Sequence, residues 1–245
     1  MTETFPKAPI TEAMIEIQVK LPGSVGLANL ECLHGRIARE YPDKKTRRMW
    51  EVTFQMQDEK DPLQKSLCRP DGYAFSSREE KQVVQFRLDG FTFSRLRPYT
   101  RWEDVFAEAG KLWSIYASET KPLKVTGLAV RYINSIEIPS KTFDYEDYFT
   151  AAPRIPPLLP QALAHFFTRL VIPFPERDAV AIVTTTPSER PDPVNTDIIL
   201  DIVVNKEVML DPADARVLQI MGILRETKNE VFFGCITEKT KELFR

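Results

Sequence analysis

The sequence predicts an α+β fold, with a curved, mostly antiparallel sheet and helices packed on one of its faces. Many segments alternate apolar and polar residues with the period of two that half-buried strands show. Most of these segments are joined by short turns, which favours antiparallel pairing. Two longer segments carry apolar residues at helical spacing, and each follows a run of strands. The expected order, β-α-β-β-β-β-α-β and then β-β-β-α, is that of an approximate two-fold repeat.

The first part of the chain predicts a strand, a helix and two further strands. Residues 13–21 alternate regularly, and residues 25–41 carry an apolar stripe at helical spacing. That stripe consists of Leu27, Leu30, Leu33 (or His34), Ile37 and Tyr41. Strands are then expected over residues 50–57 and 72–76. Between the helix and the first of these strands lies a basic run that we expect to form a charged turn: Lys44, Lys45, Arg47 and Arg48.

A hairpin is predicted in the middle of the chain. Residues 84–89 alternate, and Asp89-Gly90 then predicts a type I′ turn, because both central positions of that turn need a positive φ. The second strand covers residues 91–96 and should end before Pro98, which cannot donate a ladder hydrogen bond.

The helix after this hairpin has the most aromatic face in the sequence. Thr100 and Glu103 have the spacing of a capping box, which predicts the start of the helix. Its apolar face carries Trp102, Phe106, Ala109, Trp113 and Tyr116. Each aromatic ring buries about 150–250 Å² when packed, so we expect the face to lie against the sheet rather than bind a ligand. Lys121-Pro122 should end the helix.

The last part of the chain predicts a long central strand over residues 125–138, because both of its faces are apolar at the middle. Four prolines within residues 151–160 indicate an irregular crossover and a division of the chain. We therefore expect an N-terminal portion, 1–150, and a C-terminal portion, 151–245, packed as one continuous unit. The second portion should contain strands over 166–173, 179–186 and 197–204, a helix opened by Asp211-Pro212, and a short helix over 238–244.

The composition excludes several classes of function. The chain has 245 residues, and its net charge is −2. The overall electrostatic field of the protein is therefore not expected to attract nucleic acid or a membrane surface. Three scattered cysteines and two histidines make a metal site improbable, and no cofactor is expected. The sequence shows neither a targeting pattern nor an apolar run of about 18 residues, so a cytoplasmic protein is expected.

No motif in the sequence predicts an enzyme. Serines occur in no nucleophile-elbow pattern, and no phosphate-binding glycine loop is present. His34 and His165 have apolar neighbours, as structural histidines do. Enzymatic action on a small anionic substrate therefore stays an alternative without a supporting motif.

Two groups of basic residues are candidate binding sites. Arg95, Arg97, Arg131 and Asn134 would form a pocket for an anion or a peptide carboxylate. The competing interpretation is that these arginines are structural, since a buried guanidinium needs a carboxylate or another acceptor. Lys44, Lys45, Arg47 and Arg48 would contact nucleic-acid phosphates, or form an ordinary solvated turn.

Four stretches resemble a known family. They are APITEAMIEIQ from position 8, FTFSRLRPYTRWEDVFAEAGKLWSIY from position 91, VRYIN from position 130 and FGCITEKTKELF from position 233. The chain resembles, over nearly its whole length, a sporadically distributed family of uncharacterised bacterial proteins. The resemblance implies no catalytic residues, and the patchy distribution implies an accessory role such as anti-phage defence.

The function expected from these observations is that of a non-catalytic adaptor or regulatory scaffold that binds another protein. Strand edges and the proline-rich segments are the expected docking surfaces. A nucleic-acid-binding accessory protein that uses the basic run 44–48 is the first alternative.

Overall fold

A computed structural model describes residues 5–57, 60–189 and 194–245. Within this part of the chain, nine strands form one open antiparallel sheet in the order β2-β3-β4-β5-β1-β6-β9-β8-β7. The strands are β1 (Ile10–Lys20), β2 (Asp43–Gln57), β3 (Lys60–Ser76), β4 (Gln82–Arg87), β5 (Gly90–Leu96), β6 (Lys124–Ile138), β7 (Thr168–Phe174), β8 (Ala179–Pro187) and β9 (Thr196–Leu210).

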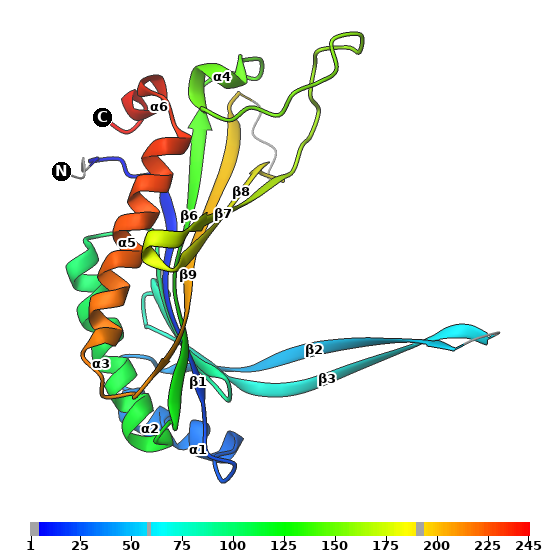
Figure 1. Ribbon diagram of the computed structural model, residues 1–245. Coiled ribbons are helices and arrows are strands. Elements are labelled where there is room, and N and C mark those ends of the chain that lie inside the picture. Colours follow the sequence, from blue (N-terminus) through cyan, green and yellow to red (C-terminus); the bar gives the residue numbers. More distant parts are fainter. Residues whose placement is uncertain (1–4, 58–59, 190–193) are drawn as a thin grey trace.

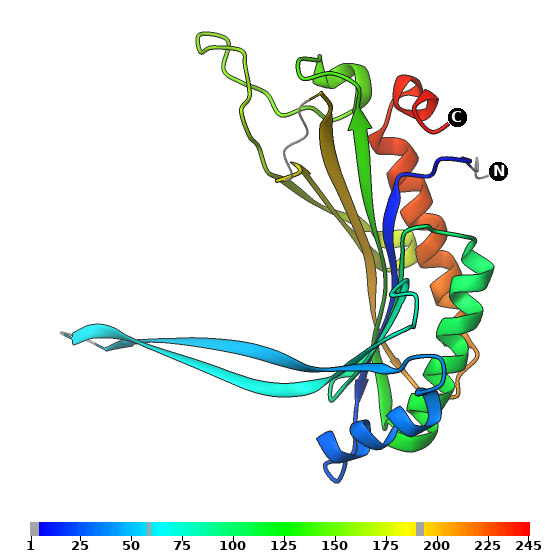
Figure 2. The ribbon, with the colours of Figure 1, turned by 180° about the vertical axis from the view of Figure 1, so that it is seen from behind.

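The two long helices lie on the same face of the sheet, and the other face is open (Figures 1 and 2). The helices are α1 (Leu27–Cys32), α2 (His34–Ile37), α3 (Trp102–Thr120), α4 (Tyr145–Tyr148), α5 (Arg216–Cys235) and α6 (Glu238–Glu242). The predicted α+β class, with a curved antiparallel sheet and helices on one face, is therefore confirmed.

The two halves of the sheet repeat one order of elements around the central pair β1 and β6. In the first half β1 is followed by short helices, the strands β2 to β5 and α3. In the second half β6 is followed by α4, the strands β7 to β9 and α5. Strand β5 flanks β1 and β9 flanks β6, so β3 and β7 occupy corresponding places. Strand β2 covers the outer edge of β3, and β7 has no such neighbour among the described strands.

The aromatic face of α3 packs against the sheet, as predicted. The ring of Trp113 lies 5.9 Å from that of Phe91, and the ring of Tyr116 lies 5.7 Å from that of Phe86. The hydroxyl of Tyr116 donates a 2.8 Å hydrogen bond to the carbonyl of Arg87. All four rings are buried and are part of the hydrophobic core.

Two local predictions around α3 are wrong. No side chain caps the helix, which begins at Trp102, and the Thr100–Glu103 capping box does not form. Gly90 does not adopt a positive φ, so the turn is not of type I′. The glycine is needed for another reason: a Cβ atom at this position would lie 2.5 Å from the carbonyl oxygen of Ile17 in the neighbouring strand.

The largest difference from the sequence prediction is the extent of β2 and β3. The basic run 44–48 lies within β2 rather than in a turn. Strand β3 pairs with β4 only over residues 72–76, and beyond that point β2 and β3 pair only with each other. A register shift between Arg47 and Arg48 marks the transition, and such bulges bend a strand. The result is a two-stranded arm that projects from the open face of the sheet (Figures 1 and 2).

Two predicted helices differ in their bounds. The helix expected over residues 25–41 is divided into α1 and α2, although Leu30, Leu33 and Ile37 are buried as predicted. Asp211-Pro212 forms a turn, and α5 begins later, at Arg216. The carboxylate of Asp214 accepts from the backbone amide of Arg216 at 2.8 Å.

Candidate functional site: the outer edge of strand β7

The predicted anion pocket is not assembled as one site. Arg131 forms a bidentate pair with Asp201 of β9, with distances of 2.9 Å from Nε to Oδ1 and 2.6 Å from Nη2 to Oδ2. The hydrogen bond to Asp201 raises the pKa of Arg131. Asn134 lies three residues along β6 and therefore points to the other face, where its amide donates to the Leu200 carbonyl at 3.0 Å. Arg131 and Asn134 are therefore both held by partners within the protein, so they have a structural role.

Arg95 and Arg97 lie at the end of β5. Arg95 pairs with Ala13 in the register, which places it on the helix-covered face, and its Nε donates to the Pro98 carbonyl at 3.2 Å. Arg97 is exposed and lines a surface groove with residues 5–10. Of the four candidates, only Arg97 faces a concave surface without a bound carboxylate.

The second basic group is divided between paired and exposed side chains. Lys44 contacts Glu31 at 2.5 Å, and Arg47 contacts Asp71 at 2.6 Å. Lys45 and Arg48 are exposed on β2. Since two of the four charges are neutralised locally, the positive footprint is narrow for a nucleic-acid surface.

The described side chains offer little for catalysis. No group of three or more histidine, cysteine or acidic residues in the described part of the chain could hold a metal ion. His34 stacks on Phe75 with ring centres 5.0 Å apart, and its Nε2 lies 3.1 Å from the Tyr41 carbonyl, which is a structural role. Burial raises the pKa of the Cys235 thiol to about 11, so this thiol is inert at neutral pH.

One buried titratable group was not singled out by its sequence context. Lys228 of α5 is buried, and its Nζ lies 3.9 Å from the ring centre of Tyr132. Burial, with a smaller contribution from the charge of Arg225, lowers the pKa of Lys228 to about 7. In the sequence it appears only as part of an amphipathic helix, which gives no sign of this environment.

The outer edge of β7, which we call the β7 edge, is a candidate binding surface. The backbone amide of Ser188 donates to the backbone carbonyl of Asp197 in β9 at 2.7 Å. Since such bonds alternate along an antiparallel pair, the backbone amides and carbonyls of the even-numbered residues of β8 point toward β9. Odd-numbered residues of β8 therefore bond to the even-numbered residues of β7 opposite them. The amides of Arg169 and Val171 consequently point outward, and Pro173 has no amide hydrogen to satisfy.

The β7 edge and the segment that leads into it carry several exposed apolar side chains, alongside the exposed polar residues Gln161, His165 and Arg169. Leu158 is 98% exposed, Phe167 is 65% exposed and Val171 is 58% exposed. Leu159, Leu163 and Leu170 are exposed as well. Because β7 has no neighbour on its outer side among the described strands, these exposed apolar side chains make its edge a candidate interaction surface.

The other edge of the sheet differs in character. Strand β2 carries a run of lysines and arginines, which are residues that discourage strand pairing. On the β7 edge only Arg169 and Pro173 have this effect. The segment before β7 contains Pro153, Pro156, Pro157 and Pro160, so it cannot supply a regular strand to cover the edge itself. Along the basic run 44–48, the β2 edge is therefore better protected against strand pairing than the β7 edge.

The sequence matches no family model, and no curated protein is significantly similar to it. None of the helices in the described residues combines the length and the apolar character that a membrane span requires.

Proposed function

We propose that the protein is a non-catalytic adaptor that binds another protein by strand addition at the β7 edge. An extended segment of the partner would pair with β7 and become a tenth strand of the sheet. The observation that carries this proposal is the pair of outward amides at Arg169 and Val171 beside exposed apolar side chains.

The arrangement of the sheet supports the same proposal. Strand β7 occupies the place that β3 has in the other half, and the edge of β3 is covered by the antiparallel strand β2. A partner strand would therefore complete the second half in the way that β2 completes the first. The resemblance to a patchily distributed bacterial family favours an accessory role, such as a component of anti-phage defence.

The proposal is tested by removing one outward amide. Val171→Pro deletes the amide hydrogen that faces the partner and leaves the hydrogen bonds to β8 intact, because those come from the even-numbered residues. Val171→Thr is the matched control, since it keeps both the amide and the β-branched shape. Both variants and the wild type would be used to capture proteins from the native host.

The expected result is a partner protein that the wild type and Val171→Thr retain and that Val171→Pro loses. Equal thermal unfolding of the two variants would show that the loss is not caused by unfolding. A set of captured proteins that is the same for all three baits would contradict the proposal, and so would the absence of any protein with this dependence.

A further inference from the structure

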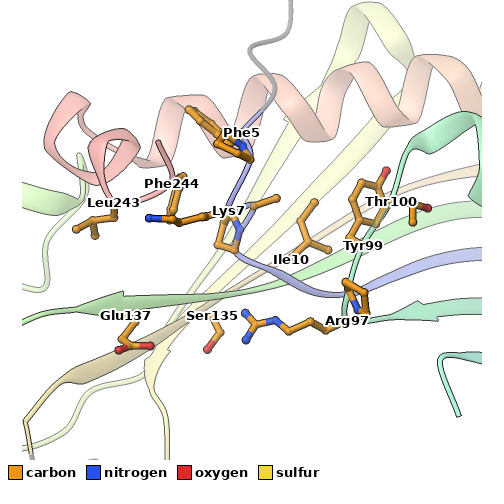
Figure 3. A pocket seen from close by; sticks show the side chains of 14 residues that line it. Phe5, Lys7, Ile10, Arg97, Tyr99, Thr100, Ser135, Glu137, Leu243 and Phe244 are labelled. Carbon is orange, nitrogen blue, oxygen red and sulfur yellow. The ribbon is translucent and has the colours of Figure 1, made fainter. Parts of the chain in front are cut away.

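A groove of about 500 Å³ lies where the two ends of the described chain approach the sheet (Figure 3). Its walls come from residues 5–10 before and at the start of β1, residues 97–100 between β5 and α3, and residues 243–244 after α6. Ser135 and Glu137 of β6 complete it. This groove is separate from the β7 edge, which lies at the far end of the strand order.

The walls are held together by hydrogen bonds and ring contacts. The backbone amide of Lys7 donates to the Phe244 carbonyl at 3.1 Å, and the amide of Ser135 donates to the Pro9 carbonyl at 2.9 Å. The ring of Phe5 packs edge-on against that of Phe244, with centres 5.4 Å apart. The groove is therefore preformed, as small-molecule sites usually are.

Two cations line the groove without a partner. Within the described part of the chain, neither Lys7 nor Arg97 has an ion pair or a side-chain hydrogen bond. Figure 3 shows the side chain of Arg97 extending along the groove toward Ser135, and that of Lys7 on the opposite wall near Leu243. Arg131, in contrast, is occupied by a carboxylate of this chain.

Two carboxylates lie nearby, and both are already bound by neutral donors. Glu137 accepts a 2.5 Å hydrogen bond from the Asn195 amide group, and Asp197 accepts one of 2.5 Å from the Ser135 hydroxyl. Their charges remain, so a ligand with two negative charges would be repelled by them. Between a ligand with one negative charge and a ligand with two, the first is repelled less by these carboxylates and can still contact Lys7 and Arg97.

We propose that the groove binds a carboxylate attached to an apolar body, such as the C-terminal residue of a peptide. The guanidinium of Arg97 is the group that matches a carboxylate in a bidentate geometry, and the ammonium of Lys7 adds a second positive charge. The apolar body would lie on the apolar residues of the wall, Phe5, Ile10, Leu243 and Phe244.

The test uses N-acetyl-phenylalanine as the probe, with its uncharged amide and inorganic phosphate as comparisons. Binding would be followed by NMR titration of the backbone amides that line the groove. The probe should produce saturable shifts there, and Arg97→Ala should raise the Kd at least about tenfold, because hydrogen bonds to charged groups are strong. Lys7→Ala should raise the Kd less, and Lys45→Ala, which removes an exposed cation from β2, should leave it unchanged.

Three results would overturn the proposal: saturation by the amide with the same Kd, tighter binding of phosphate than of the carboxylate, or no saturable shift at all. Arg97→Gln provides a second variant that keeps the apolar stem of the side chain. If Arg97→Ala unfolds the protein, loss of binding in a folded Arg97→Gln variant supports the proposal and unchanged binding contradicts it.

Discussion

Replacement of Lys228 by methionine should stabilise the protein, and the gain should disappear at high pH. The ammonium of Lys228 is buried in α5 over the ring of Tyr132, and burial lowers its pKa from the ordinary 10.5 to about 7. Between these two values the unfolded chain holds a proton that the folded chain does not. The free energy of unfolding of the wild type therefore rises with pH across this window. The contribution from Lys228 is lost again as the pH falls toward 7.

The size of the effect follows from the shift. Each pKa unit corresponds to about 1.4 kcal/mol. A shift from 10.5 to about 7 therefore corresponds to a difference of roughly 4–5 kcal/mol in the free energy of unfolding between a pH below 7 and a pH above 10.5. The ring face of Tyr132 offsets about 1–2 kcal/mol of this penalty by a cation–π contact. Methionine has a similar volume and no charge, so Lys228→Met should raise the free energy of unfolding by about 2–4 kcal/mol at pH 6.5.

The assay is urea unfolding followed by tryptophan fluorescence at pH 6.5, 8.0 and 9.5. The difference between the wild type and the variant cancels groups that titrate in both proteins. Lys45→Met, which removes an exposed lysine, should show no difference that depends on pH. If Lys228→Met is less stable than the wild type by the same amount at every pH, the lysine is not a penalised buried charge.

The remaining predictions concern the core, a close contact and the alternative function. Trp113→Ala should lower the free energy of unfolding by about 3–5 kcal/mol in the same urea assay, because its ring packs in the core; a change below 1 kcal/mol would contradict that placement. Gly90→Ala should cost about 1–3 kcal/mol, since the added Cβ meets the Ile17 carbonyl at 2.5 Å, and an unchanged urea midpoint would argue against the contact. A short single-stranded DNA should not bind the protein at physiological salt. If it does bind, and if changing Lys45 and Arg48 to alanine weakens this binding, the result would support the nucleic-acid alternative.

The parts of the fold that the sequence predicts are those that depend on local periodicity. Burial alternates along β1 from Ala13 to Lys20, as the sequence pattern predicts, and the aromatic stripe of α3 repeats at helical spacing, so both follow from the sequence alone. The basic run 44–48 does not alternate apolar and polar residues, because it lies near the sheet edge rather than over the core. Its place in β2 depends on pairing with β3, and no local pattern encodes that pairing.

The candidate sites depend still more on long-range pairing. Arg131 meets Asp201 because the register of β6 on β9 brings together residues that are 70 positions apart. Among the described strands, the β7 edge has no pairing partner because β7 is the last strand in the order of the sheet. The groove around Lys7 and Arg97 joins segments from both ends of the chain. These contacts depend on which strands are neighbours and on their register. Local sequence patterns do not specify either, so the contacts could not be predicted from the sequence.

The most direct test of strand addition at β7 is amide hydrogen exchange with and without the captured partner. In the free protein, the amides of Arg169 and Val171 should exchange quickly, and those of Leu170 and Ile172 should be protected by β8. Binding should slow exchange at Arg169 and Val171 specifically. Unchanged exchange at both amides in a saturated complex would show that the partner binds elsewhere.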